Sequence, residues 1–387
     1  MAITLTGPHS FAGSYALDAR APLIWVQLGP SGSTGAVIAA QGDMYAWGLG
    51  VRGVVGDNTT VTRTLPVKIL GSWTSVAGGF THRLAIKSGG SLWAWGTGTS
   101  GQLGQSSPAH RSSPTQVGTS SWANVAAQYD SSFAVRSDGT LWAWGTNIFN
   151  NLGIEEAAAQ PEYSSPVQIG TDTNWLNAKF QRNNFMAYSQ AAIKSDGSLW
   201  QWGSDSGYGS LATNSGLAEG LGITYTPEKV GTSSWIMIDT TEAVVSAIRA
   251  DGGLFTWGAA DFDRIDLENP DRSSPVQIGT ESWTWISGGN DISGGGYFFG
   301  IRADGTLWGW GYNTGGQLGQ GDRIHRSSPT QIGTDTWAYV QAGLGAVYGI
   351  KTDNTVWAWG VGGGSRLGNG STASRSSPVQ ITALPVA

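Results

Sequence analysis

The sequence contains no cysteine among its 387 residues, which excludes disulfide bonds, thiolate catalysis and cysteine-based metal sites. Charged residues are scarce as well, at 12% of the chain against about 25% in a typical soluble domain. The net charge is −6 and no basic block occurs, so we expect no nucleic-acid partner. No run approaches the roughly 20 apolar residues of a membrane span, and residues 1–10 lack the features of a secretory signal.

Side chains arranged for catalysis are also missing from the sequence. The four histidines are His9, His82, His110 and His325, and no two of them have the spacing of metal ligands. The acidic residues Asp261, Asp263 and Asp266 lack the glycine and the terminal glutamate of a calcium loop. No nucleophile–base pair can be proposed. We therefore predict that the chain is not an enzyme and uses neither a cofactor nor a metal ion.

Glycine and tryptophan are abundant instead, with 59 and 20 copies, and they recur with a fixed period. Seven copies of an aromatic-x-Trp-Gly segment end at Gly48, Gly96, Gly145, Gly203, Gly258, Gly311 and Gly360. Each copy is preceded by a further tryptophan: Trp25, Trp73, Trp122, Trp175, Trp235, Trp283 and Trp337. The copies lie 48 to 58 residues apart, which is the period of a propeller blade rather than of a helical array.

The repeat predicts four antiparallel strands in each blade, which we name A to D. Strand A begins at the leading tryptophan, and strand B ends in an Asp-Gly pair that predicts a two-residue hairpin turn. Strand C is the aromatic-x-Trp-Gly segment, with large aromatics at period two. Strand D begins at a proline, which suits the first position of a strand. We expect the last strand, residues 378–381, to join the first blade at Trp25 and so close the ring.

Gly101-Gln102-Leu103-Gly104, Gly316-Gln317-Leu318-Gly319 and Phe80-Thr81-His82 resemble the regulator-of-chromosome-condensation repeat. The resemblance covers about residues 25–382 and implies an all-β, seven-bladed propeller, with a structural role for His82. The degenerate Arg-Ser-Ser-Pro-Val-Gln-Ile-Gly-Thr units are similar to propeller repeats of phage and bacterial proteins. We therefore expect a propeller over residues 25–387 and an N-terminal arm, residues 1–24, outside the repeat.

Departures from the repeat are the candidates for function. Trp285 stands where other blades have smaller or polar residues, and the spacing from the leading tryptophan to the Trp-Gly pair grows from 22 to 27 residues in blades four and six. The insertions all fall in A–B and C–D loops, which open on one face of a propeller. We predict a binding face there, formed by Arg182, Phe185, Tyr208, Tyr225, Phe262, Arg264, Trp285 and Asp291. The alternatives are neutral drift of the loops and, for Trp285, local repacking between blades.

Three classes of function fit a non-enzymatic propeller. The first is a structural or accessory protein of a bacteriophage virion, from tail or capsid, that binds other virion proteins or a host-surface receptor, alone or as a homo-oligomer within an assembly. The second is a secreted, extracellular bacterial propeller that binds or inhibits a protein or glycan. The third is guanine nucleotide exchange, as in the founding member of the family, against which the pI near 5.2 argues where chromatin binding is concerned. The first class is the one we favour.

Overall fold

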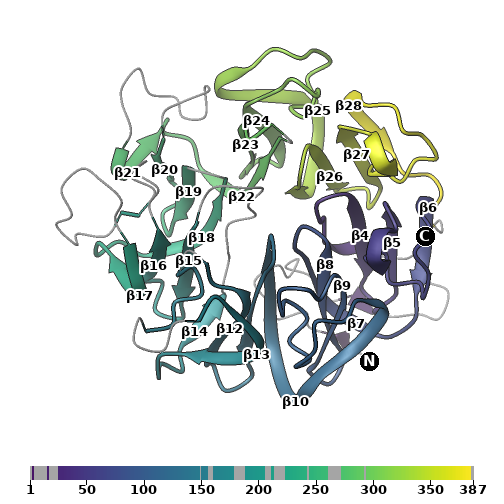
Figure 1. Ribbon diagram of the computed structural model, residues 1–387. Helices are drawn as coiled ribbons and strands as arrows, with labels where there is room; N and C mark the ends of the chain where they lie inside the picture. Colours follow the sequence, from purple (N-terminus) through teal and green to yellow (C-terminus); the bar gives the residue numbers. More distant parts are fainter. Residues whose placement is uncertain are drawn as a thin grey trace.

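The computed structural model describes residues 2–3, 15–16, 25–148, 150–155, 160–177, 188–204, 211–212, 223–241, 244–259, 272–291 and 293–384. Within these ranges the regular structure is β, apart from two short 3-10 turns, η1 (Val51–Gly53) and η3 (Gly363–Ser365). Figure 1 looks along the axis of a ring of antiparallel sheets. In the part of the chain described, no helix has the length and hydropathy that crossing a bilayer requires.

The first three blades follow the predicted order of strands. Blade 1 consists of β3 (Trp25–Leu28), β4 (Thr34–Ala39), β5 (Met44–Gly48) and β6 (Arg63–Ile69). Blade 2 consists of β7 (Trp73–Gly78), β8 (His82–Lys87), β9 (Ser91–Gly96) and the first part of β10 (Arg111–Gln128). Blade 3 takes the second part of β10, then β11 (Ser131–Arg136), β12 (Leu141–Thr146) and β13 (Glu162–Ile169). One continuous strand therefore serves as strand D of blade 2 and strand A of blade 3.

The remaining strands complete the ring. Blade 4 consists of β14 (Trp175–Asn177), β15 (Tyr188–Lys194), β16 (Leu199–Ser204) and β17 (Ile223–Val230). Blade 5 consists of β18 (Trp235–Thr240), β19 (Val244–Arg249), β20 (Leu254–Gly258) and β21 (Arg272–Ile278). Blade 6 consists of β22 (Trp283–Asn290), β23 (Gly296–Arg302), β24 (Thr306–Gly311) and the first part of β25 (Arg326–Ala342). Blade 7 takes the second part of β25, then β26 (Ala346–Lys351), β27 (Val356–Gly360) and β28 (Arg375–Gln380).

The B–C turns differ in detail from the predicted two-residue hairpin. In blade 3 the Gly139 N–H donates to the Arg136 carbonyl, and Arg136 N–H donates to the Thr140 carbonyl, so three residues form the loop. Gly139 has φ +85°, whereas Asp138 is not among the residues with positive φ. The aspartate instead accepts hydrogen bonds from the backbone N–H and the hydroxyl of Thr140 at 3.0 and 2.6 Å. The aspartate therefore serves to cap the turn with its side chain, and only the glycine adopts the left-handed conformation. The predicted hairpin would have required that conformation at both residues.

Neighbouring blades are joined through the buried strand-C tryptophans. The Trp144 indole N–H of blade 3 donates to the Gln102 carbonyl in the C–D loop of blade 2, at 2.9 Å. The Leu103 side chain next to that carbonyl is completely buried. A Cβ on Gly104 would lie 2.8 Å from the indole nitrogen of Trp144, so this position requires glycine. In this Gln-Leu-Gly motif the glutamine carbonyl accepts the indole N–H, the leucine side chain fills the core, and the glycine allows the next blade's tryptophan to approach closely.

The same contact recurs around the ring and also closes it. The equivalent donor–acceptor pairs are Trp95 with Val54, Trp202 with Asn151, Trp359 with Gln317 and, across the closure, Trp47 with Arg366. The leading tryptophan supplies a second link, because its backbone N–H donates to the glycine carbonyl in the B–C turn of the preceding blade. These pairs are Trp73 with Gly42, Trp122 with Gly90, Trp175 with Gly139, Trp235 with Gly197, Trp283 with Gly252 and Trp337 with Gly305.

The closure itself differs from the expected strand pairing. Strand β28 pairs with β27 of its own blade, and the four strands of blade 1 pair with one another. The C-terminal segment joins the first blade through its side chains, because Ile381 and Leu384 belong to the same buried cluster as Trp25. The Trp25 N–H donates to the side-chain oxygen of Asn354, at 2.8 Å. Here the side-chain oxygen of Asn354 accepts the bond that the turn carbonyl accepts in the other six junctions.

Four residues of the N-terminal arm lie within the described ranges. They form two short strands, β1 (Ala2–Ile3) and β2 (Tyr15–Ala16), which pair antiparallel. The rest of residues 1–24 lies outside the described ranges, so the predicted role of the arm stays a prediction.

The blade junction predicts a large penalty for shortening its buried leucine. Leu103→Ala should lower the free energy of unfolding by roughly 2–5 kcal/mol, because it leaves a cavity between blades 2 and 3. The matched control is Leu70→Ala, since Leu70 is 82% exposed and should change stability by less than about 0.5 kcal/mol. Chemical denaturation of both variants measures the difference, and equal midpoints would contradict the junction's role.

The closing bond can be tested at Asn354. Asn354→Gly removes the acceptor of the Trp25 backbone N–H and should lower the free energy of unfolding by about 1 kcal/mol. Asn354→Ala should cost about 1–2 kcal/mol more, because Asn354 has φ +68°, a conformation that alanine adopts poorly. Thermal unfolding of both variants gives the comparison. If the alanine variant is no less stable than the glycine variant, the left-handed backbone at the closure is not a constraint.

Candidate functional site

The A–B and C–D loops open on one face of the ring, which we call the loop face. Backbone bonds hold the two loop sets together: Leu49 N–H donates to Ser33 O, Thr97 N–H to Thr81 O and Val361 N–H to Gly345 O. The opposite, hairpin face carries the B–C and D–A turns. This division agrees with the face assignment predicted from the sequence.

A central pocket lies on the loop face, where A–B loops of blades 1, 2, 3, 6 and 7 meet. Its enclosed volume is about 30 Å³, which is room for about two water molecules. The lining residues are Pro30, Ser31, Gly32, Gly78, Gly79, Phe80, Ala127, Gln128, Tyr129, Asn290, Gly343 and Leu344. These residues come from segments far apart in the sequence, so the pocket exists only in the closed ring.

Backbone hydrogen bonds between neighbouring A–B loops fix the shape of this pocket. They run from Gly32 N–H to the carbonyls of Gly79 and Phe80, from Phe80 N–H to Tyr129 O, from Asn290 N–H to Gly343 O and from Gly345 N–H to Asn290 O. The rings of Phe80 and Tyr129 stack with centroids 5.1 Å apart and planes 23° apart. The pocket is therefore preformed and has one aromatic side, at blades 2 and 3.

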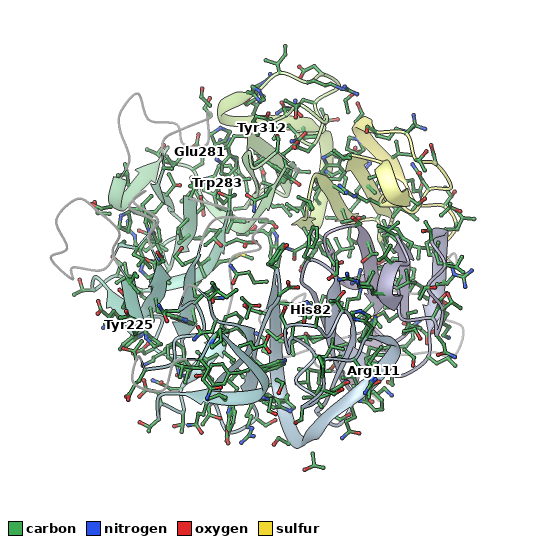
Figure 2. The ribbon with its side chains drawn as sticks, in the orientation of Figure 1. His82, Arg111, Tyr225, Glu281, Trp283 and Tyr312 are labelled. Carbon is green, nitrogen blue, oxygen red and sulfur yellow. The ribbon has the colours of Figure 1, made fainter. Side chains whose placement is uncertain are left out.

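His82 lies beneath this aromatic side, and Figure 2 shows it near the axis. Its ring is completely buried, and its Nε2 is 2.9 Å from the Ser132 hydroxyl oxygen, which itself donates to the Gln102 carbonyl at 2.7 Å. Burial, aided by the charge of Arg83, lowers the pKa of His82 to about 3. The neutral ring thus links blades 2 and 3, in keeping with the structural role implied by the resemblance.

Two of the predicted site residues lie in the described part of the loop face region. The Asp291 carboxylate is buried and accepts bonds from Gln317 Nε2 and Thr314 Oγ1 at 2.8 and 3.1 Å, and from the backbone N–H and hydroxyl of Ser293. Asp291 therefore holds the A–B and C–D loops of blade 6 together. Tyr225 is half-buried in β17, on the outer edge of blade 4 and far from the axis (Figure 2).

Trp285 lies elsewhere than predicted. It is the third residue of β22 and pairs with Ile301, one position before the B–C turn, so it lies toward the hairpin face. Its indole N–H donates to the Val340 carbonyl at 2.7 Å, and its ring centroid is 4.4 Å from that of Tyr339. These contacts correspond to the alternative of repacking between blades 6 and 7. The prediction that Trp285 lies on the loop face is wrong, because strand A starts at the hairpin face and Trp285 is only the third residue of that strand.

Five further predicted residues lie outside the described ranges, so their contribution to binding stays a prediction. They are Arg182, Phe185, Tyr208, Phe262 and Arg264. The acidic run from Asp261 to Asp266 lies there too. Among the residues that are described, no group of three or more metal-ligating side chains occurs.

Sequence reasoning missed an array of cation–π contacts near the hairpin face. A basic residue two positions before the first residue of the turn pair (aspartate in four blades, Gly89 in blade 2) stacks on the outer strand-C tryptophan, with the charged group 3.5–3.6 Å from the ring centroid. The pairs are Lys87 with Trp93, Arg136 with Trp142, Lys194 with Trp200, Arg302 with Trp308 and Lys351 with Trp357. The fixed spacing of the basic residue was the available signal. The contacts stabilise each blade individually.

The described strands, arranged as seven four-stranded blades around an axis with a preformed pocket, define a β-propeller. Comparison with known families identifies its repeats: the model of the regulator of chromosome condensation (RCC1) repeat matches residues 41–86, 89–135, 304–346 and 353–386. These four segments of the propeller are therefore similar to RCC1 repeats. The matched segments fall in blades 1 to 3 and in blades 6 and 7, and they include both Gln-Leu-Gly motifs, in blades 2 and 6.

Individual relatives agree with this assignment. The ultraviolet-B receptor UVR8 of Arabidopsis thaliana is 32% identical over 149 residues, which is 37% of this chain and 31% of that protein. The chain thus spans less than one third of this curated relative, and still less of others. Human WBSCR16 has a TM-score of 0.75 at 16% identity, covering 94% of both chains. Prp20p of Saccharomyces cerevisiae has a TM-score of 0.73 at 18% identity, covering 93% of this chain and 87% of that one.

The buried histidine predicts a pH-dependent stability. The pKa of His82 falls from 6.5 in a model compound to about 3 in the folded chain. Between these values the unfolded state binds more protons, so stability is present above pH 6.5 and is lost as the pH falls toward 3, at up to about 1.4 kcal/mol per pH unit. His82→Gln should flatten this dependence, measured by denaturation between pH 3 and 7. His110→Gln, at an exposed position, is the control, and identical slopes for His82→Gln and the unsubstituted chain would contradict the prediction.

Proposed function

We propose that the chain is a non-enzymatic protein-binding scaffold that holds its partner on the loop face. The observation that carries the proposal is that this face combines the preformed central pocket with exposed aliphatic side chains. Val51, Val61, Ile148 and Ile324 are 47%, 54%, 65% and 63% exposed, and all four belong to C–D loops. Exposed apolar groups on the same face as a concave site are typical of protein-interaction surfaces.

The scarcity of charge supports short-range recognition. With 12% charged residues the surface offers little long-range steering, so complementarity of shape and apolar contact must select the partner. The structural neighbour Prp20p is described by its binding to Gsp1p and histones, which shows that this fold can present a protein-binding surface. The likeness concerns the fold alone, and we do not extend those partners to this chain.

The finer hypothesis from the sequence is a structural or accessory role in a bacteriophage virion, with a secreted binding or inhibitor propeller as its alternative. The relatives named above come from plant, human and yeast, and none of them supports a virion. The virion role and its location therefore stay predictions. Mass spectrometry of purified particles and of the secreted fraction distinguishes the two: fixed stoichiometry in particles supports the first, and recovery only in the secreted fraction contradicts it.

A comparison of the two faces tests the scaffold role. The loop-face variant carries Val51→Asp, Ile148→Asp and Ile324→Asp, and the matched hairpin-face variant carries Leu70→Asp and Ile236→Asp. All five positions are more than 45% exposed, so both variants should fold with nearly unchanged stability. We expect the loop-face variant to lose at least tenfold of the protein that the unsubstituted chain captures from its source, measured by quantitative mass spectrometry. Loss in the hairpin-face variant alone would move the binding surface to the other face.

A further inference from the structure

The third residue of strand A lies close to the hairpin face, and it divides the ring into two parts. In blades 1 to 4 this residue is polar: Gln27, Ser75, Asn124 and Asn177. In blades 5 to 7 it is large and apolar: Met237, Trp285 and Tyr339. We call the last three residues the Trp285 patch.

The Trp285 patch is continuous across its three blades. The A strands that carry it contact one another, β18 with β22 and β22 with β25. The Trp285 ring centroid is 4.4 Å from that of Tyr339, and Trp285 also packs against the buried cluster that contains Met237. Met237 and Tyr339 are buried, whereas Trp285 is only half-buried. The patch therefore presents an indole ring at the hairpin face.

The N-terminal arm joins the ring beside this patch. The Trp25 backbone N–H donates to the side chain of Asn354, in the B–C turn of blade 7, so the chain enters blade 1 at the hairpin face. Strand β3 contacts β25, and Trp25 and Tyr339 belong to one buried cluster, against which Trp285 packs. Since consecutive Cα atoms are about 3.8 Å apart, residue 24 must lie next to that cluster.

The end of the arm has the length and composition to cover the patch. Residues 17–24 connect the β1–β2 hairpin to blade 1, and they include three large aliphatic residues, Leu17, Leu23 and Ile24. Eight residues reach at most about 26 Å. Packed sheets lie about 10 Å apart, so two steps from β3 through β25 to β22 are about 20 Å. Because an isolated two-stranded hairpin is only marginally stable in water, the arm also gains from a surface to pack on.

We propose that residues 17–24 of the arm dock on the Trp285 patch and cover the exposed face of the Trp285 ring with their aliphatic side chains. The polar residues of blades 1 to 4 leave this side of the ring as the apolar surface beside the point of entry. Burial of the indole face and of the leucines then drives the docking. The inference goes beyond the proposed function and does not depend on it, because the patch lies toward the hairpin face and the scaffold role concerns the loop face.

The first test uses the full chain, in which two introduced thiols meet no native cysteine. Ala19→Cys is combined with Thr284→Cys, at an exposed position next to Trp285. The control combines Ala19→Cys with Leu70→Cys, since Leu70 is exposed on a turn of the hairpin face in blade 1. A docked arm raises the effective concentration of one thiol at the other. In a glutathione buffer we expect at least fivefold more disulfide between positions 19 and 284 than between 19 and 70, measured by peptide mass spectrometry.

Equal disulfide fractions in the two variants would overturn the proposal, because an undocked arm has no preference between the positions. Disulfides that join two chains would assign the patch to the arm of a second copy, and would overturn docking within one chain.

The second test measures how well the arm covers the indole. Leu17→Asp with Leu23→Asp should raise the oxidation of Trp285 by hydroxyl radicals at least threefold, with Trp308 as the reference, since Trp308 is covered by Arg302. Thr4→Asp with Thr6→Asp adds the same charge outside residues 17–24 and is the matched control. Thermal unfolding confirms that both variants are folded. Equal oxidation of Trp285 in the two variants would overturn the contact.

Discussion

The hydrogen bond from a buried indole to the carbonyl of the preceding blade is the contact on which the ring depends. Because donor and acceptor belong to different blades, each blade is fixed by its neighbours rather than by its own sheet alone. The bond also explains the local sequence, since the acceptor is followed by a buried aliphatic residue and by a glycine that clears the indole, as Gln102, Leu103 and Gly104 do against Trp144. Arg366 repeats the contact on Trp47, so the closure uses the same chemistry as the other described junctions.

The fold could be predicted from the sequence to the level of blades and strands. Aromatic residues at period two, a turn signal and a proline recur in one phase, and each has a local physical cause. The closure could not be predicted in the same way, because a repeat pattern does not state which distant strands pair. Strand β28 pairs within blade 7, and Asn354 bridges to Trp25 with its side chain. The continuity of strand β10 was also not predicted, because Pro114 and Trp122 each indicated the start of a separate strand.

The binding site was harder to predict, since the search followed the longest departures from the repeat. Those insertions lie largely outside the described residues, and Trp285 proved to pack between blades 6 and 7. The central pocket is instead built from five A–B loops, in which residues near 30 meet residues near 343, and four of these loops are of ordinary length. The lengthened loop of blade 6 contributes Asn290. The available signal was the large apolar or aromatic residue at the A–B turns of blades 2, 3 and 7, namely Phe80, Tyr129 and Leu344.

Rigidity connects the repeat to recognition. A backbone carbonyl is a weak basis for selectivity when the loop that carries it can turn away, because ordering the loop then opposes binding. In this ring the A–B loops of neighbouring blades are tied by their own N–H groups, so the carbonyls are already oriented before a ligand arrives. The bonds between neighbouring A–B loops therefore give the pocket its fixed shape. A chain with few charges can in this way present a preformed surface to a partner.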